Sequence, residues 1–496
     1  MNTFNKPETK RKPTIWEALI PIVFLIGMLI LNVLTFGDAG MDGSIQIILI
    51  FSTAIASIIL LRRGYSWEEL QSGIVKSTMS AYPSILILLL IGALAGSWMV
   101  SGIVPAMIYY GLKVLNPTIF LVASCLICAL VSVVSGSSWS TVATVGIALL
   151  GIGKALGFSE GLIAGAIISG AYFGDKISPL SDTTNLAPAV SGTDLFTHIR
   201  YMIYTTVPTF IITLIIFLVL GLNGNGDIDP TAQVSGVLSA IENKFNLTPA
   251  LFLVPVIVFI LILKKMPAAP VLLIGSLLGI VWAFIFQGDS LLEVAGENVD
   301  HAYFRGGMQA LFGDISLVTE SDMVNDLLSA GGMAGMLNTV WLILMAMAFG
   351  GVMDAGGLLK KLTDSLLTLV SSETSLVGST AFSCIFLNVT TSDQYMSIVV
   401  PGKMYADAFK EKGLAPENLS RTLEDTGTVT SVLVPWNTCG ATQAGVLGVP
   451  TLEYFYYCFF NMMSPIMTML FITFKIKIKR LKEERTTEPV SEVVEA

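Results

Sequence analysis

The residues best suited to chemistry lie in the stretch Gly170–Asn185, which follows an apolar helix. Two carboxylates, Asp175 and Asp182, flank Pro179 in this stretch. Proline has no backbone N–H and breaks a helix, so it leaves free carbonyl oxygens beside these carboxylates. Such hard oxygen ligands suit a small cation. The hydroxyl and amide side chains that we expect to join them as ligands are Ser178, Ser181, Thr183, Thr184 and Asn185.

The other interpretation of this stretch is a polar loop at a membrane surface, with ordinary caps and turns. We favour a binding site because apolar residues flank the stretch on both sides. Carboxylates inside a membrane segment are costly and usually functional. Lys176 could pair with either carboxylate, and the sequence leaves its role open.

A second stretch further along the chain repeats the order of a helix, a proline, and then Asn and Thr. Asp425 precedes Pro435 by about three helical turns, and Asn437 and Thr438 follow the proline. We predict Asp425, Asn437 and Thr438 as further ligands. Arg421 lies one turn before Asp425 and could neutralise one of the acids. In the alternative interpretation Glu424, Asp425 and Arg421 form a solvated entrance.

Two apolar runs, 117–152 and 375–400, are each interrupted in the middle by a polar cluster. At such a break the N-terminus of a half-helix leaves backbone N–H groups unpaired, which suits an anion or a polar substrate. Helix capping alone would also explain the Ser and Thr residues. The side chains predicted to bind there are Ser135, Ser137 and Ser138 in the first cluster and Asn388, Thr391 and Asp393 in the second.

The composition places these clusters in a membrane protein. Of the 496 residues, 53% are hydrophobic and only 13% are charged, against roughly 25% charged residues in a soluble chain. The mean hydropathy is +0.76. These values exclude a soluble enzyme, a disordered protein and a nucleic-acid binder. An intramembrane enzyme is poorly supported, because the sequence has no HExxH motif and no evident Ser/His pairing.

Apolar runs of membrane-spanning length recur along the chain and must position the polar clusters. Lys and Arg stay on the cytoplasmic side of a membrane, and their positions agree with the threading only if 117–152 and 375–400 are re-entrant hairpins. The predicted fold class is therefore an all-α polytopic membrane protein, with about ten transmembrane helices, two re-entrant hairpins, broken helices and both termini cytoplasmic. The predicted crossings are about 15–36, 44–61, 82–100, 160–190, 197–221, 248–264, 269–287, 338–353, 418–448 and 452–474.

The two halves of the chain share weak matches in a preserved order, such as Gly96 with Gly350 and Gly170 with Gly427. Because the first half has five predicted crossings, the second half is inverted. Inverted repeats with discontinuous helices are typical of secondary transporters. The predicted parts are a cytoplasmic tail 1–14, a first membrane repeat 15–222, an extracellular linker 223–247, a second membrane repeat 248–476 with an acidic extracellular insertion 288–337, and a cytoplasmic tail 477–496.

The stretch from Gly170 to Pro208, GAYFGDKISPLSDTTNLAPAVSGTDLFTHIRYMIYTTVP, resembles the NhaC-type Na+/H+ antiporter family. The likeness extends over most of residues 10–480. It implies a secondary active antiporter of the ion-transporter superfamily in a bacterial cell membrane, with Na+ and H+ as cargo and no cofactor. The residues that match the family's motif are Asp175, Ser178, Asp182, Thr183, Thr184 and Asn185.

Competition between Na+ and H+ for the same carboxylates would couple their movements. A carboxylate in a medium of low dielectric holds a proton more readily than one in water. We predict Asp182 and Asp175 as the main Na+ ligands, with Asp393 and Asp425 as second choices. Because the family includes malate/Na+-lactate antiporters, the alternative is a Na+- or H+-coupled transporter of small organic acids or amino acids. The lipid bilayer is a further expected partner, nucleic acid is not, and a homodimer is left open.

Overall fold

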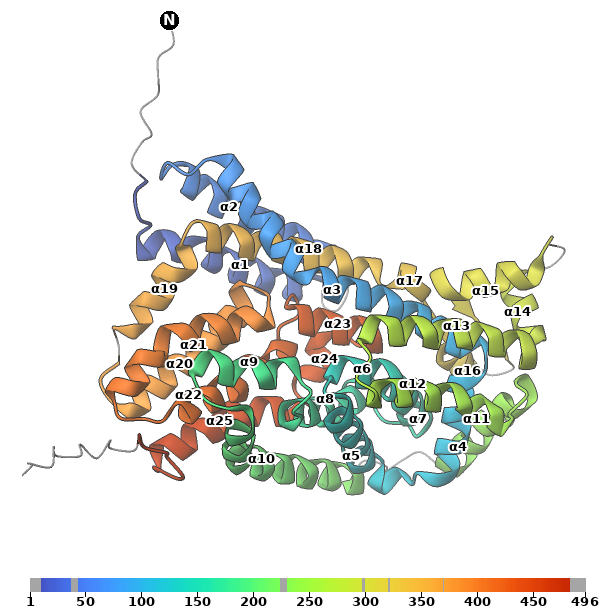
Figure 1. Cartoon of the computed structure of the whole chain (residues 1–496). Helices are drawn as coiled ribbons and strands as arrows, with labels where there is room; N and C mark the ends of the chain where they lie inside the picture. The colour runs from blue at the N-terminus through green and yellow to red at the C-terminus, as the bar shows by residue number, and fades with distance from the viewer. Residues whose placement is uncertain are drawn as a thin grey trace, which may run out of the picture.

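The computed structural model of this chain describes residues 10–36, 43–223, 230–296, 299–319, 322–368 and 370–481. These residues are almost entirely helical (Figure 1). The strands among them are β1 (Ile315–Ser316) and β2 (Ser329–Ala330), which pair antiparallel with Ile315 opposite Ala330. The predicted all-α class is confirmed.

Within the described part of the chain, seven helical segments are long and apolar enough to cross a membrane, and an eighth span results if one bent pair is counted. The bent pair turns by 94° between α11 (Pro230–Lys244) and the helices η3 (Pro249–Phe252) and α12 (Leu253–Leu263). The chain is a multi-pass membrane protein. The seven segments are α1 (Ile15–Phe36), α2 (Ser44–Leu61), α3 (Trp67–Val100), α5 (Pro117–Ser135), α10 (Leu195–Asn223), α13 (Ala268–Phe286) and α17 (Gly332–Gly335) with α18 (Leu337–Ala355).

Most of these helices agree with the predicted runs, but α3 begins fifteen residues before the predicted start at 82. Its first turn is held by a capping box, in which the Ser66 hydroxyl accepts from the Glu69 backbone N–H and the Glu69 carboxylate accepts from the Ser66 N–H. A capping box satisfies orphan donors at a helix start. The helix therefore extends into a polar segment that hydropathy alone leaves out.

The polar breaks predicted in the first half are present. Gly136, with φ +68°, ends α5, and Ser137 caps the next helix. A second break at Ser178–Ser181 separates α8 from α9. The remaining helices of this half are α4 (Ile103–Val114), α6 (Ser138–Thr141), the π-helix η2 (Val142–Gly146), α7 (Ile147–Ala155), α8 (Glu160–Ile177) and α9 (Asp182–Ser191).

The second half contains a helical hairpin and its own broken helix. The helices α20 and α21 pack against each other on either side of the turn at residues 391–393. The remaining helices are α14 (Gly288–Ala295), α15 (Ala302–Phe312), α16 (Asp322–Leu327), α19 (Leu358–Leu367), α20 (Glu373–Thr390), α21 (Gln394–Glu411), α22 (Pro416–Leu423), the π-helix η4 (Glu424–Thr428), the 3-10 helix η5 (Ser431–Leu433), α23 (Thr438–Leu447), α24 (Thr451–Phe455) and α25 (Phe459–Thr473).

The broken helix α8 lies in the core and packs closely against α5. A Cβ added at Gly170 would lie 2.1 Å from the Cys125 carbonyl oxygen, and one added at Gly174 would lie 2.3 Å from that of Ala129. Small residues permit such close approach of helix backbones. The two glycines therefore fix the position of the last turn of α8, which carries Asp175.

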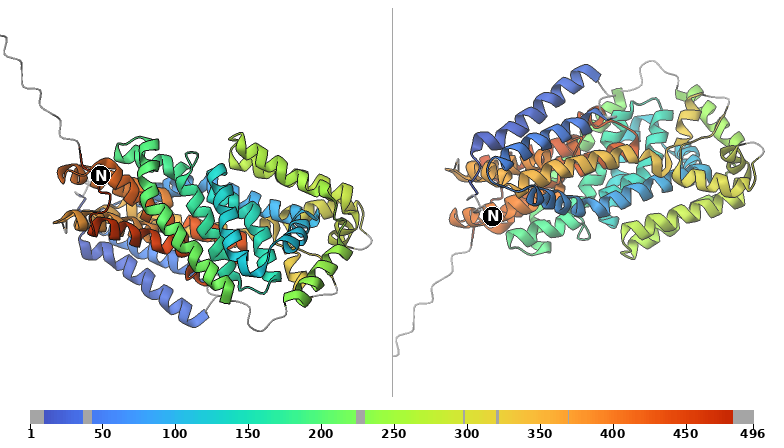
Figure 2. Two further views of the ribbon diagram at one scale, coloured as in Figure 1. Left: turned by 90° about the horizontal axis from the view of Figure 1, so that it is seen from below. Right: turned by 90° about the horizontal axis from the view of Figure 1, so that it is seen from above.

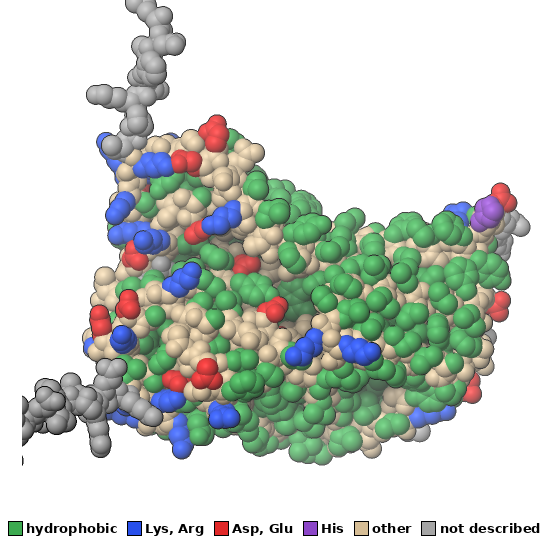
Figure 3. Space-filling view, viewed as in Figure 1, with side chains coloured by type: hydrophobic (Ala, Val, Ile, Leu, Met, Phe, Trp, Pro, Cys, Tyr) green, Lys and Arg blue, Asp and Glu red, His purple; other side chains and the backbone are tan. Residues whose placement is uncertain are grey.

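The surface agrees with a membrane location. Large apolar side chains such as Leu34, Leu130 and Leu222 are exposed, and apolar atoms cover most of the face in Figure 3, whereas charged side chains gather towards the end where α1 begins. The helices α1 and α25 place the start and the end of the described chain at the same end of the molecule (Figures 1 and 2). A chain that crosses a membrane an even number of times begins and ends on the same side. The cytoplasmic side of that end, the two re-entrant hairpins and the inverted repeat stay predictions.

Candidate functional site

The polar breaks of both halves meet at one cavity of about 660 Å³. Its walls come from α3, the turn between α5 and α6, the break between α8 and α9, the segment joining α12 to α13, the α20–α21 turn, and the start of α23. Among the predicted ligands that meet at this cavity, Ser135 and Thr438 are 303 positions apart in the chain. The predicted site residues that line it are Ser135, Ser137, Asp175, Ser181, Asp182, Thr183, Asp393 and Thr438.

Asp175 joins the break in α8 to the first polar turn. Its carboxylate accepts hydrogen bonds from the Ser138 backbone N–H at 3.0 Å and from the Ser138 hydroxyl at 2.7 Å. Ser138 is the first residue of α6, and the preceding Ser137 accepts from the Ser140 N–H at 3.2 Å as the cap of that helix. Charge-assisted bonds of this kind are stronger than neutral ones. The predicted ligand Ser138 thus orients a carboxylate rather than lining the cavity itself.

Asp182 is the first residue of α9 and the most open of the cavity carboxylates. Ser181 caps the helix by accepting from the Thr184 N–H at 3.4 Å. The Asp182 side chain is exposed at the cavity, whereas Asp175 and Asp393 are 9% and 5% exposed. Water therefore reaches one carboxylate freely, while the other two lie deeper in the protein.

The second half contributes Asp393 and Thr438. The Asp393 carboxylate caps α21 by accepting from the Met396 N–H at 2.9 Å. The Thr438 N–H, at the start of α23, donates to the Ser392 carbonyl at 2.9 Å. This bond ties the α20–α21 turn to the proline-broken segment, so both polar breaks of the second half reach the cavity together.

Several predicted ligands brace these breaks and lie outside the cavity lining. The Asn437 amide donates to the Asn388 carbonyl at 3.0 Å, and the Asn388 amide donates to the Gly427 carbonyl at 2.7 Å. The Thr391 hydroxyl donates to the carbonyl of Leu387 at 2.8 Å. Buried polar groups need such partners. The second half therefore uses its amides to connect α20, η4 and α23.

The same bracing occurs in the first half. The Ser178 hydroxyl donates to the Val133 carbonyl at 2.7 Å, and the Thr184 hydroxyl donates to the Lys176 carbonyl at 2.9 Å. The Asn185 amide donates to the Ser181 carbonyl at 2.7 Å. Carbonyls freed by Pro179 are thus partly taken up by side chains of the same segment. These three residues hold the shape of the break.

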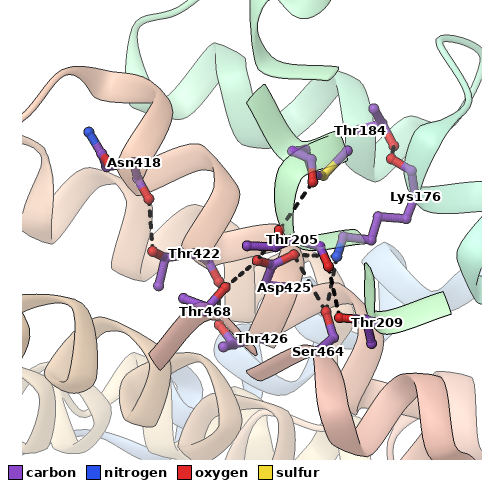
Figure 4. A network of polar contacts seen from close by, with 11 residues as sticks. Lys176, Thr184, Thr205, Thr209, Asn418, Thr422, Asp425, Thr426, Ser464 and Thr468 are labelled. Carbon is purple, nitrogen blue, oxygen red and sulfur yellow. Dashed lines mark hydrogen bonds and ion pairs between the residues drawn. The ribbon is translucent and has the colours of Figure 1, made fainter. Parts of the chain in front are cut away.

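Asp425 lies in a different environment from the cavity carboxylates. It forms a fully buried ion pair with Lys176 (Figure 4). Its other carboxylate oxygen accepts from the Thr205 hydroxyl at 2.9 Å and from the Thr468 hydroxyl, and the Lys176 ammonium also donates to Ser464 at 3.0 Å. A buried charge pair of this kind needs additional hydrogen bonds. Lys176 thereby acquires a role that the sequence leaves open.

The residues beside Asp425 are buried as well. Glu424 and Arg421 are both 0% exposed, so the alternative of a solvated entrance is wrong. The Arg421 guanidinium stacks 4.6 Å from the centre of the Tyr201 ring, which makes a cation–π contact. Neither carboxylate oxygen of Glu424 accepts a hydrogen bond from the residues that the structure describes. Arg421 therefore does not neutralise Asp425; Lys176 does.

Other cavity residues were missed by the sequence analysis. Ser80 and Ser84 lie one turn apart on α3, and Lys265 lies in the segment before α13. The spacing of the two serines in the middle of α3 is a detectable signal, because residues four apart share a helix face. No comparable signal marks Lys265. The remaining polar or aromatic lining residues that were not predicted are Trp139, Ser140, Thr144, Gln394 and Tyr395.

The chemistry of the lining is that of oxygen donors. Among the residues that the structure describes, no three His, Cys, Asp or Glu side chains come together as they do around a transition metal. Carboxylates and hydroxyls from both halves instead face one space. Hard alkali and alkaline-earth cations prefer such ligands. The cavity can therefore hold a small hydrated cation, and it has room for a larger polar solute.

Comparison with known proteins points the same way. The Na+/H+ antiporter family matches this chain over residues 170–476. The Na+/H+ antiporter NhaC of Alkalihalophilus pseudofirmus is 38% identical over 418 residues, which are 82% of this chain and 85% of that protein. The malate-2H+/Na+-lactate antiporter of Bacillus subtilis is 36% identical over 90% of this chain and 91% of its own length. The arginine/ornithine antiporter ArcD of Halobacterium salinarum is 35% identical, with 93% and 92% covered.

Proposed function

The chain belongs to the Na+/H+ antiporter family, and from this premise we propose that it exchanges Na+ for H+ by alternating access at the 660 Å³ cavity. It is a secondary transporter and not an enzyme. The observation that carries the proposal is the meeting of Asp175, Asp182 and Asp393 in one space. Carboxylates buried at membrane depth usually mark ion pathways or proton relays.

Asp182 and Asp175 are the proposed sites of competition between the two ions. Asp182 receives the ion from water, because its side chain is exposed at the cavity. Asp175 is held deeper by Ser138, and Ser181 and Thr183 add hydroxyl oxygens beside it. Na+ requires ionised carboxylates, whereas a proton neutralises them, so each ion displaces the other. Asp393 is the additional carboxylate from the second half.

Coupling follows from the charge of the empty site. Three carboxylates without Na+ or H+ are costly to carry through a medium of low dielectric, so the protein changes its access only when the cavity is loaded. Lys176 and Asp425 neutralise each other outside the cavity. The charge that changes during the cycle is then confined to the cavity carboxylates.

The proposed setting is the cell membrane, with both ends of the chain in the cytoplasm. Support comes from the distribution of Lys and Arg, which stay on the cytoplasmic side. Lys10, Arg11 and Lys12 precede α1, and basic residues follow α25. The structure places the start of α1 and the end of α25 at one end of the molecule.

A second candidate function is exchange of small organic anions. The cavity of about 660 Å³ falls within the range of small-molecule pockets, roughly 300–1,000 Å³, and is far larger than one Na+ needs. Lys265 lines it and supplies a positive charge for a carboxylate group. Relatives named for malate and lactate or for arginine and ornithine are 36% and 35% identical to this chain over the aligned residues.

The decisive test is flux in proteoliposomes that contain the purified protein and a pH-sensitive dye. An imposed Na+ gradient should drive H+ movement, and Asp182→Asn should reduce it to the level of empty liposomes. Asp407→Asn is the matched control, since Asp407 is exposed on α21 and outside the cavity. Undiminished exchange by Asp182→Asn would remove this residue from the mechanism. Flux of malate, lactate or arginine without Na+-driven H+ movement would favour the second candidate.

A further inference from the structure

A second cavity of about 320 Å³ lies further along the same helices. It is lined by parts of α3, α4, α7 and α23, by the first residue of α8, and by residues 326–336 of the acidic insertion. The 660 Å³ cavity is lined by other parts of α3 and α23 and by the helix that leads into α7. We call the 660 Å³ cavity the ligand cavity and the 320 Å³ cavity the distal cavity. Both cavities therefore share three walls.

Each shared wall passes from one cavity to the other within a few residues. On α3, Ile87 lines the ligand cavity and Gly92 lines the distal cavity. On the helix through η2 and α7 the corresponding residues are Thr144 and Ile147, and on α23 they are Thr438 and Gly445. At 1.5 Å per residue, the section between the cavities is roughly 5–10 Å thick.

The section between the cavities contains two buried polar side chains of α23 without hydrogen-bond partners among the described residues. Thr442 and Gln443 are both 0% exposed. The Thr442 hydroxyl and both amide atoms of Gln443 have no hydrogen-bond partner among the described residues. By contrast, Thr422, Thr426 and Thr430 each donate to the carbonyl four residues earlier in the chain. Buried polar atoms without partners are rare and call for an explanation.

Helical spacing places these two side chains in line with the cavities. Thr442 lies one turn after Thr438, which lines the ligand cavity, and one turn before Val446, which lines the distal cavity. Gln443 lies one turn before Leu447, another residue of the distal cavity. Residues four apart share a helix face. Thr442 thus lies on a face of α23 that lines both cavities, and Gln443 lies on a face that lines the distal cavity.

We propose that the two cavities are the ends of one translocation path along α3, η2–α7 and α23, closed here between them, and that Thr442 and Gln443 supply oxygen ligands to the cation as it passes. The proposal rests on the proposed function of the ligand cavity. When the section opens, the side-chain oxygens of Thr442 and Gln443 would bind the cation and its water molecules. The surrounding residues of α3, including Leu88 and Ile91, are apolar and buried, so they cannot replace those oxygens.

The path is tested by thiol accessibility on one helix. Ser84→Cys lies at the ligand cavity and Ala95→Cys at the distal cavity, and both positions on α3 are partly buried. An impermeant maleimide should react with the two variants from opposite faces of sealed vesicles, and labelling of Ala95→Cys should stop transport. The five native cysteines are buried, and the unmodified protein is the control for their reaction. Labelling of both variants from one face, or unimpaired transport after full labelling of Ala95→Cys, would overturn the path.

The ligand role is tested by Thr442→Val and Gln443→Leu. Each should raise the Na+ concentration for half-maximal exchange by about tenfold, as expected for a lost bond to a charged group. Thr213→Val is the matched control, because the buried Thr213 hydroxyl donates to the Thr209 carbonyl of its own helix. Unchanged Na+ dependence in both variants would overturn the role of these residues. Thiol accessibility does not depend on the cargo, so failure of Na+/H+ exchange alone would contradict only the proposed function.

Discussion

The two proline-broken segments, 170–185 in the first half and 421–438 in the second, place their carboxylates differently. Asp175 lies in the last turn of α8, next to the break, and faces the ligand cavity. Asp425 lies ten residues before Pro435, in the π-helix η4, and pairs with Lys176 away from the cavity. The first segment therefore presents carboxylates to the ligand cavity, whereas the second pairs Asp425 with Lys176 inside the bundle.

This difference assigns separate tasks to similar sequence patterns. The ligand cavity is lined by two carboxylates from the first segment and by hydroxyl groups from both. The second segment is braced against α20, because the Asn388 amide of α20 donates to Gly427 and the Asn437 amide donates to the Asn388 carbonyl, and a pair joining α8 to η4 connects the halves. A carboxylate at a break can change partners, but a carboxylate within a packed helix cannot do so without leaving a buried charge unpaired.

The largest expected effect comes from separating the buried pair. Lys176→Met should lower the free energy of unfolding by about 3–5 kcal/mol, because Asp425 is left as an uncompensated buried charge. Thermal unfolding of the purified protein in detergent measures the change. Lys265→Met removes an exposed lysine at the cavity and should cost under about 1 kcal/mol. Recovery of stability in Lys176→Met/Asp425→Leu would identify the unpaired charge as the cause. Equal losses of stability in Lys176→Met and Lys265→Met would contradict the expected difference between the buried and the exposed lysine.

The second effect distinguishes Asp175 from Asp425 by how much Na+ raises the unfolding temperature of their variants. At one hundred times its dissociation constant, a bound ion stabilises a protein by about 2.7 kcal/mol. Asp425→Asn should retain a Na+-dependent rise in unfolding temperature, even from a lower starting value, and Asp175→Asn should lose most of it. The comparison uses choline in place of Na+ at constant ionic strength. A Na+ response that survives in Asp175→Asn and disappears in Asp425→Asn would reverse the assignment of the two segments.

The smallest expected effect is the loss of stability when the helix cap after each break, Ser181 or Asn437, is removed. Ser181 caps α9 with one hydrogen bond, so Ser181→Ala should cost about 1 kcal/mol. Asn437 caps α23 and also donates to Asn388, so Asn437→Ala should cost about 2 kcal/mol. Unfolding temperatures of both variants without Na+ provide the measurement. Equal or inverted costs would mean that the second segment is no more strongly braced than the first.

Much of this architecture is readable from residue types and spacing. Apolar runs specify α1, α2, α10, α13 and α18, because only continuous apolar surface is stable in lipid. Pro179, Gly136 and the clustered Ser and Thr mark the places where helices must break. The local sequence thus predicts which segments are irregular and which side chains lie there, including eight predicted ligands that line the ligand cavity.

Tertiary packing decided what each of those side chains does. No local pattern relates Lys176 to Asp425, which is 249 residues away, or brings Lys265 and the middle of α3 to the cavity. Sequence spacing describes neighbours on one helix, whereas a partner across the bundle depends on how whole helices pack. For that reason the set of polar side chains at the breaks follows from the sequence alone. Which of them line the cavity, which brace the breaks and which form the buried pair is decided only when α8, η4 and α23 pack together.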